Sequence, residues 1–494
     1  MTSRAAVLPG PGRAEAERTL WIVVGIALAV VLAAAVLRVQ ANPILAAVVL
    51  PLALVAWQRT LLAWPTLLGL TLVVILFIPI RRYTVGGGLP FELEPYRLLL
   101  GVILVGWLFA VCADPAVRWR ATGFELPALV VIVGILGSLA LNISRVNAVS
   151  GLVVKQVTFF LTFFLIVYFV ASVMERGPKL ERMIRLLVAG GTVLAVLSLI
   201  EWRTGTNFFN GLHHVIPFLN YVDFGEHIAR GTGFRALGSA QHPIALGAAL
   251  AMLIPLTVYL YRRDDHVVWL VCGALLTLGA FASGSRTAAI MLVVLLLTFL
   301  WIKRQETMRL LPMLIPLAIV IQIVMPGTLG TFRAILQPSY LVREQSQELG
   351  SGSGRIADLG PSLSEWSQKP LLGQGFGTRV VSTSLGPGDV GSGGTVVASD
   401  VQILDNQWLT TLLEIGAVGV LGLVWLFCRA VRRLAQRARS DPGPDGWLAT
   451  ALAAALAAFA VGMLTFDAFA FIQVTFIAFI MLGFTAVLTR QPGK

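Results

Sequence analysis

The sequence contains little charge. Of its 494 residues, 13% are Asp, Glu, Lys or Arg, whereas 57% are hydrophobic and the mean hydropathy is +0.84. Because a soluble domain carries about one quarter charged residues, this composition excludes an ordinary soluble protein and indicates a polytopic membrane protein. The net charge of +12 does not indicate nucleic-acid binding, since most Lys and Arg residues flank apolar runs, as membrane topology requires.

Cysteine and histidine are also scarce, with three and five residues. The cysteines lie in or at the end of apolar segments without paired spacing, which excludes a disulfide framework and gives no metal-site pattern: Cys112, Cys272 and Cys428. The histidines show no ligand spacing either, since His213 and His214 are adjacent and His227 and His242 are isolated. We therefore expect no metal and no cofactor, and structural roles for these histidines.

Long apolar runs are abundant. With about 20 residues needed for each span, the sequence predicts an all-α polytopic membrane protein with about 14 transmembrane helices, at about 19–38, 43–57, 60–80, 97–113, 125–142, 152–174, 183–202, 243–261, 267–283, 286–302, 310–326, 408–430, 447–465 and 468–489. The second range is short, and its prolines leave a re-entrant segment or a different count open. We expect residues 1–18 to be a disordered cytoplasmic tail, 19–489 to be one transmembrane domain and 490–494 to be a short cytoplasmic tail.

The distribution of Lys and Arg orients the predicted bundle. A cytoplasmic N-terminus makes the charge-rich loops cytoplasmic, and an even number of helices returns the C-terminus to the same side. Two long loops, at about 203–242 and 327–407, then fall on the outer face. In the second loop, the spacing of four apolar residues predicts an amphipathic helix that lies on the membrane or covers the bundle: Ile356, Leu359, Leu363 and Trp366.

The end of the second outer loop is unusually polar where it enters the next apolar run. If a helix starts near Asn406, then Asn406, Thr410 and Glu414 share one face, with Gln407 beside them. A carboxylate such as Glu414 costs a few kcal/mol in hydrocarbon, so we expect this face to point into the protein or a wet cavity. For Asp405, two interpretations are open: a helix N-cap or a member of a functional site.

Three arginines lie on the predicted outer side, where positive charge is disfavoured. Arg235 precedes the helix that starts near Pro243, Arg286 lies in a short Ser/Gly turn, and Arg355 follows Gly354 in the long loop. Guanidinium groups bind diphosphates bidentately, so these residues are candidates for a diphosphate clamp. The alternative is that each pairs with a helix C-terminus, a lipid phosphate or a distant carboxylate.

Four motifs, in this order along residues 230–420, together resemble the O-antigen ligase and O-antigen polymerase superfamily of bacterial membrane glycosyltransferases. They are Arg235-Ala-Leu-Gly with Gln241-His242-Pro243, Ser283-Gly-Ser-Arg286, Arg355 followed by Pro370-Leu-Leu-Gly-Gln-Gly-Phe-Gly377, and Asp405-Asn406 with Leu409, Glu414 and Gly416. The glycine-rich Gly373–Gly377 segment follows no strand, so we interpret it as a tight turn and not as a nucleotide loop.

The resemblance implies a metal-independent, inverting transfer from a polyprenyl-diphosphate-linked glycan donor to a glycan or lipid acceptor. It places the protein in the bacterial plasma membrane among membrane lipids, with the site on the extracytoplasmic face. In that family a histidine precedes the asparagine, whereas here Asp405 stands before Asn406. This departure is compatible with an inactive relative or with a carboxylate that acts as the base.

From the resemblance and this chemistry we expect Asp405 to be the base and Glu414 to orient the site. Arg235 and Arg286 would bind the diphosphate, Arg355 would join them or order the loop, and Asn406 and Gln407 would complete the substrate-binding set: Arg235, Arg286, Arg355, Asn406 and Gln407. A lipid-linked glycan or solute transporter is the alternative, but the few interior charges, such as Lys155, and the lack of an internal repeat favour an enzyme. Ligase and polymerase differ in the acceptor. The sequence does not distinguish between these two activities, and it does not show the oligomeric state.

Overall fold

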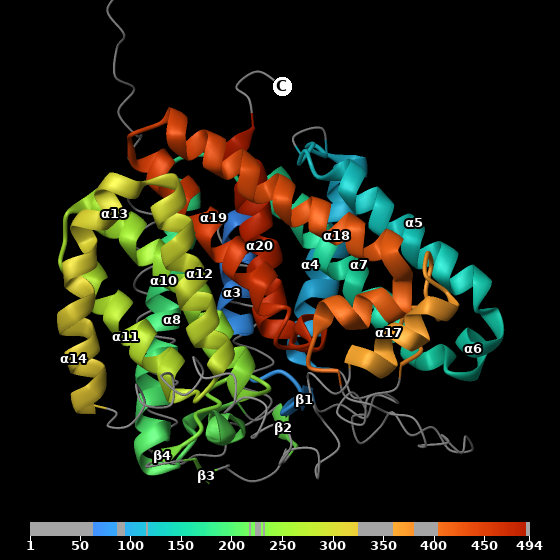
Figure 1. Cartoon of the computed structure of the whole chain (residues 1–494), viewed down its shortest axis with the longest axis horizontal. Helices are drawn as coiled ribbons and strands as arrows, with labels where there is room; N and C mark the ends of the chain where they lie inside the picture. Colours follow the sequence, from blue (N-terminus) through green and yellow to red (C-terminus); the bar gives the residue numbers. More distant parts are fainter. Residues whose placement is uncertain are drawn as a thin grey trace, which may run out of the picture.

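The computed structural model describes residues 63–85, 94–114, 117–216, 219–222, 229–230, 233–324, 359–379 and 404–490. Within these ranges the chain is a bundle of apolar helices (Figure 1). The predicted helices at 19–38 and 43–57, both tails except Arg490, and much of the loop at 327–407 lie outside the described residues. The total of about 14 helices therefore stays a prediction.

Eight helical segments of the described chain are long and apolar enough to cross a membrane. They are α4 (Pro95–Ala113), α7 (Ser150–Val173), α8 (Pro178–Thr204), α10 (Pro243–Asp264), the segment Arg304–Val324, α18 (Gln407–Ser440), α19 (Pro444–Gly462) and α20 (Ile472–Thr489). The segment Arg304–Val324 comprises α13 (Arg304–Leu310), η2 (Leu311–Met313) and α14 (Leu314–Val324). Four shorter apolar helices accompany them: α3 (Trp64–Phe77), α5 (Glu125–Leu141), α11 (Val268–Ala282) and α12 (Arg286–Ile302). Each predicted helix between residues 60 and 489 is thus present, and a multi-pass membrane protein is supported.

The core of the bundle is formed by α10, α19 and α20, whose apolar windows are 78%, 78% and 94% buried. Alanine is frequent in α19, from Ala449 to Ala458, and small side chains let neighbouring helices approach closely. At the periphery, only 28% of the α4 window and 11% of the Arg304–Val324 window is buried. These outer helices present apolar side chains at the surface, as a lipid-facing helix does.

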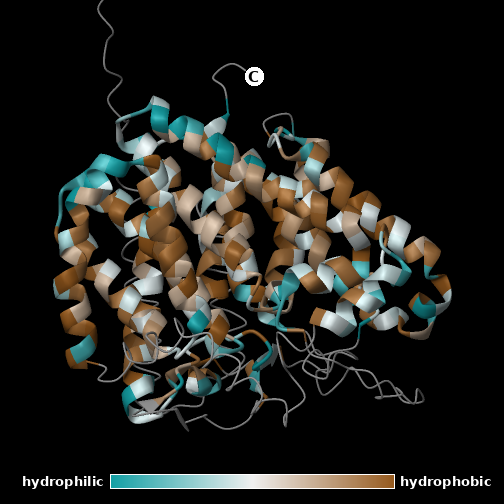
Figure 2. Cartoon of the chain, viewed as in Figure 1, coloured by the Kyte–Doolittle hydropathy of each residue, from teal (hydrophilic) through white to brown (hydrophobic). Residues whose placement is uncertain are grey.

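The two ends of the bundle differ in structure. Hydrophilic residues gather at the upper end of the view in Figure 2, where α18 extends to Ser440, ten residues beyond its predicted end. At the opposite end lie two short antiparallel strand pairs that the all-α prediction omits. β1 (Tyr83–Val85) pairs with β2 (Leu219–Tyr221), and β3 (Ala229–Arg230) pairs with β4 (Gly233–Phe234). Short segments complete the described chain: α6 (Ile143–Ala148), η1 (Phe208–Gly211), α9 (Leu212–Val215) and η6 (Ala468–Ala470).

The predicted amphipathic helix is present as α17 (Leu359–Gln368). It packs against α18. Trp366 contributes to a small apolar cluster formed by Leu404, Leu409 and Leu413. Helix α17 therefore covers the beginning of α18, which is the second of the two positions that its amphipathic pattern allowed; Ile356 lies outside the described residues.

Candidate functional site

The helix α18 is broken at Gly416, where φ is 73° and ψ is −167°. Ala417 and Val418 donate their backbone N–H groups to the carbonyls of Pro370 and Leu371, at 2.9 and 3.2 Å. The carbonyls of Leu413 and Glu414 accept in return from the N–H groups of Gln374 and Gly375, at 2.8 and 3.3 Å. The chain at 370–375 thus satisfies the groups that the break leaves unpaired, which makes non-helical backbone tolerable within a span.

Glycine is required on both sides of this junction. A Cβ atom on Gly416 would lie 2.3 Å from the backbone of Leu371, and one on Gly373 would lie 2.6 Å from the carbonyl oxygen of Leu413. Gly373, Gly375 and Gly377 all have positive φ, a region that glycine enters at little cost. The predicted tight turn at Gly373–Gly377 is therefore confirmed, and its role is to dock against the break in α18.

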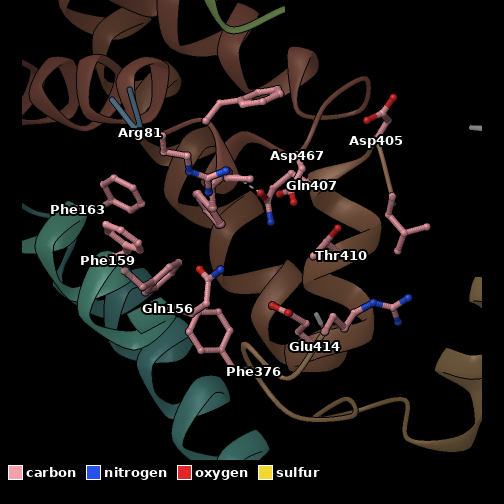
Figure 3. A pocket seen from close by; sticks show the side chains of 16 residues that line it. Arg81, Gln156, Phe159, Phe163, Phe376, Asp405, Gln407, Thr410, Glu414 and Asp467 are labelled. Carbon is pink, nitrogen blue, oxygen red and sulfur yellow. Dashed lines mark hydrogen bonds between the residues drawn. The ribbon is translucent and has the colours of Figure 1, made fainter. Parts of the chain in front are cut away.

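A cavity of about 100 Å³ opens beside the first two turns of α18 (Figure 3). Gln407, Thr410 and Glu414 line it from α18, and Asp405 lies toward the edge of the group. The facing wall comes from four parts of the chain. Helix α7 contributes Gln156, Phe159, Phe160 and Phe163; the turn after α3 contributes Arg81; the segment after Gly375 contributes Phe376 and Arg379; and the connection between α19 and α20 contributes Asp467 and Phe469. The predicted polar face of α18 thus points into a protein-lined cavity, as its carboxylate requires.

The charged groups of this cavity are of both signs. Burial, followed by the nearby Asp405 carboxylate, raises the pKa of Asp467 to about 7. Burial lowers the pKa of Arg81, an effect that Glu94 opposes. Arg379 contacts both carboxylate oxygens of Glu365 at 3.0 Å. The cavity can therefore exchange a proton near neutral pH and place positive charge beside a bound anion.

Two of the predicted residues at the start of α18, Asn406 and Gln407, make hydrogen bonds that hold the helix in place. Asn406 is the N-cap, since its side-chain oxygen accepts the N–H of Leu409 at 3.1 Å; the N-cap interpretation of Asp405 is therefore wrong, by one residue. Gln407 is buried and accepts the N–H of Phe469 at 2.7 Å. This bond ties α18 to the connection that carries Asp467.

The two described arginines of the predicted diphosphate clamp lie together at another turn. The Arg235 Nε donates to the Ser283 carbonyl at 3.3 Å, and Arg286 is the first residue of α12. The next residue, Thr287, contacts Thr465 at 2.8 Å, in the same connection as Asp467. In the part of the chain that the structure describes, neither Arg235 nor Arg286 lines the cavity, and Arg355 lies outside that part.

A buried polar network holds the loop that contains Arg235. The Glu201 carboxylate accepts the N–H groups of Gly238 and Leu237 at 2.7 and 3.2 Å. Arg82 donates to the carbonyls of Gly238 and Ala240 at 3.2 and 2.7 Å. These bonds position the loop before α10, although none of them involves the Arg235 side chain. Next to it, His242 caps α10 by accepting the N–H of Ile244 at 3.2 Å, a structural role as expected.

Four further residues of the cavity were not among the candidates predicted from the sequence: Arg81, Gln156, Arg379 and Asp467. A signal existed for two of them: Arg81 follows an apolar run on the predicted outer side, against the positive-inside rule, and Asp467 is a carboxylate between two adjacent apolar runs, where ionisable groups are functional candidates. Among the described residues, no three His, Cys, Asp or Glu side chains are placed to hold a metal ion, so the absence of a metal stays a prediction.

Comparison with known proteins bears on the segment that holds this site. A search of curated proteins returned no match. Residues 270–424 match the model of the O-antigen ligase family, and this range includes Arg286, Asp405, Gln407 and Glu414. This match supports the resemblance to the O-antigen ligase and polymerase superfamily that the motifs of the chain predict.

Proposed function

We propose that the protein transfers or polymerises glycan from a polyprenyl-diphosphate donor onto an acceptor hydroxyl at the outer face of the bacterial plasma membrane. The observation that carries this proposal is the cavity at the start of α18, which combines carboxyl and guanidinium groups at one end of a membrane bundle. Five of its polar residues lie in the segment that matches the O-antigen ligase family: Arg379, Asp405, Gln407, Thr410 and Glu414. A glycosyltransferase needs both kinds of group, one to accept a proton and one to offset charge on the leaving group.

In the proposed reaction, the acceptor oxygen attacks the anomeric carbon of the donor sugar from the side opposite the diphosphate. The bond from that carbon to the diphosphate oxygen breaks, and the diphosphate leaves with the electron pair. Asp405 takes the proton of the acceptor hydroxyl, and Glu414 orients the reacting groups from the wall of the cavity. Inversion at the sugar follows from this single displacement, and the reaction uses no metal.

In this proposal, the positive charge that stabilises the leaving diphosphate comes from the turn between α11 and α12. Arg235 and Arg286 bind the diphosphate, with Arg355 joining them or ordering its loop, while Asn406 and Gln407 hold the entrance of α18 in place. The contact between Arg235 and Ser283 supports this assignment, because it brings the Arg235 side chain to the turn that precedes Arg286.

The test is the size distribution of lipid-linked and mature surface glycan in cells whose own copy is replaced by Asp405→Ala or Arg286→Ala. Arg304→Ala is the matched control, because Arg304 is exposed and follows the other end of α12. We expect lipid-linked glycan to accumulate with the first two variants and normal glycan with the control, at equal membrane levels of each protein. Single repeats on the lipid would identify a polymerase, and full-length chains on the lipid would identify a ligase.

Normal glycan in both the Asp405→Ala and the Arg286→Ala cells would contradict the proposed site. An Asp405→Asn protein with normal turnover would contradict the base assignment alone, because asparagine retains the shape of the side chain but does not accept the proton.

A further inference from the structure

A second cavity, of about 380 Å³, lies between α4 and α7. Most of its wall is apolar, with contributions from Leu100, Leu104, Val154, Phe159 and Phe476. Thr158 and Thr162 also line it, but each hydroxyl donates to the backbone carbonyl four residues earlier, at 2.7 Å. Because these hydroxyls are satisfied within α7, the surface offered to a ligand is mainly hydrocarbon, apart from Arg97 and Lys155; we call this cavity the α4–α7 groove.

Two glycines keep the α4–α7 groove open, one from each helix. A Cβ atom on Gly101 of α4 or on Gly151 of α7 would meet no described atom within 4 Å. Both residues are exposed. Larger side chains at these positions would therefore occupy the groove without displacing any described part of the protein.

The α4–α7 groove adjoins the cavity of the proposed site. Phe159 belongs to both walls, and on α7 the consecutive residues Lys155 and Gln156 line the groove and the cavity respectively. The Arg97 guanidinium lies 4.8 Å from the centre of the Phe159 ring, and its Nε lies 3.2 Å from a Glu94 carboxylate oxygen. The boundary between the apolar groove and the polar cavity thus carries two cations, Arg97 and Lys155, and one carboxylate near them.

We infer that the α4–α7 groove binds the isoprenoid chain of an anionic lipid whose diphosphate head group passes Arg97 and Lys155 toward the proposed site. The inference rests on the proposed function, because it identifies this lipid with the donor. The α4–α7 groove begins beside an exposed helix face and ends at a polar cavity. Its apolar and charged parts therefore follow each other in the same order as the chain and the head group of such a lipid. An isoprenoid chain held in the α4–α7 groove stays in the membrane while the head group of the lipid reaches the reacting residues.

The test uses a polyprenyl diphosphate that carries a photoreactive diazirine on its chain, with the full-length protein in lipid nanodiscs. Gly101→Trp fills the α4–α7 groove, and Gly106→Trp is the matched control, since Gly106 is an exposed glycine of the same helix with no described atom within 4 Å of its Cβ position and no place in the groove wall. Gly151→Leu fills the groove from the opposite helix. We expect cross-links on peptides of α4 and α7, reduced about tenfold or more by Gly101→Trp or Gly151→Leu and retained in Gly106→Trp, where tenfold corresponds to ~1.4 kcal/mol of binding.

Cross-links that map to other helices, or that persist in both groove-filling variants, would overturn the inference. So would displacement of the probe by excess phosphatidylglycerol as readily as by unlabelled polyprenyl diphosphate, because the groove would then be an ordinary lipid contact. The proposed function fails separately: it is wrong if the wild-type protein cross-links in the groove but Asp405→Ala and Arg286→Ala leave glycan transfer intact.

Discussion

The break in α18 makes Gly416 a position where a very small substitution, glycine to alanine, has a calculable effect on the site. Replacing Gly416 by alanine keeps the composition apolar but places a Cβ atom 2.3 Å from the carbonyl group of Leu371. The backbone there has φ 73° and ψ −167°, which costs a residue with a side chain roughly 1–3 kcal/mol. The segment at 370–375 must therefore move away, or α18 must adopt another path.

Movement of this segment weakens the two bonds that Ala417 and Val418 make to Pro370 and Leu371. At a net value of roughly 0.5–1.5 kcal/mol for each hydrogen bond, and with the backbone cost above, we expect Gly416→Ala to destabilise the junction by roughly 2–6 kcal/mol. The lower value corresponds to about 30-fold faster local opening. The turn at Gly373–Gly377 then loses its docking site, and Glu414 loses its place in the cavity.

Hydrogen exchange followed by mass spectrometry measures this opening directly. In Gly416→Ala, peptides that contain the amides of Gln374 and Ala417 should exchange about 30-fold faster or more, and glycan transfer should fall in parallel. Gly360→Ala is the control, since a Cβ atom there meets no described atom within 4 Å and helical alanine is favoured over glycine by roughly 0.5–1 kcal/mol. Equal exchange in Gly416→Ala and the wild-type protein would refute the argument that this glycine permits the junction.

Three further predictions concern buried polar groups. Because the pKa of Asp467 is raised from 3.8 to about 7, the folded protein binds more protons than the unfolded chain within that interval. The free energy of unfolding should therefore fall as pH rises through it, and Asp467→Asn should remove this decline in thermal unfolding curves; an unchanged pH profile would contradict it. Gln407→Leu leaves the Phe469 N–H without its 2.7 Å acceptor and should cost roughly 1–3 kcal/mol, visible as a lower Tm in detergent; a Tm equal to that of wild type would count against this bond. Glu201→Gln replaces a carboxylate that accepts the Gly238 N–H at 2.7 Å. It should raise the KM for the donor with little change in Tm, whereas a lower Tm with an unchanged KM would limit Glu201 to a structural role.

Much of the fold could be predicted because hydropathy is a local property of the chain. An apolar run of about 20 residues must be helical in a membrane, since its backbone groups find partners only within the run. The polar face of α18 could be predicted for the same reason: the four-residue spacing of Thr410 and Glu414 places them together, and the cost of a carboxylate in lipid directs them inward.

The composition of the site was decided by tertiary structure. Arg81 and Asp467 are far apart in the sequence and reach one cavity only because α20 packs against both α3 and α19. Helix α18 starts at Gln407, so Asn406 and not Asp405 is its N-cap. The path of α18 required backbone hydrogen bonds with the segment at 370–375, which lies about forty positions earlier in the chain. The positions of the helices and the polar face of α18 could be read from the sequence alone, because they follow from short-range spacing and transfer free energy. The break at Gly416, the α4–α7 groove beside Phe159 and the separation of Arg286 from the cavity depended on which helices pack together, because a backbone partner or a cavity wall is supplied by residues that are distant along the chain.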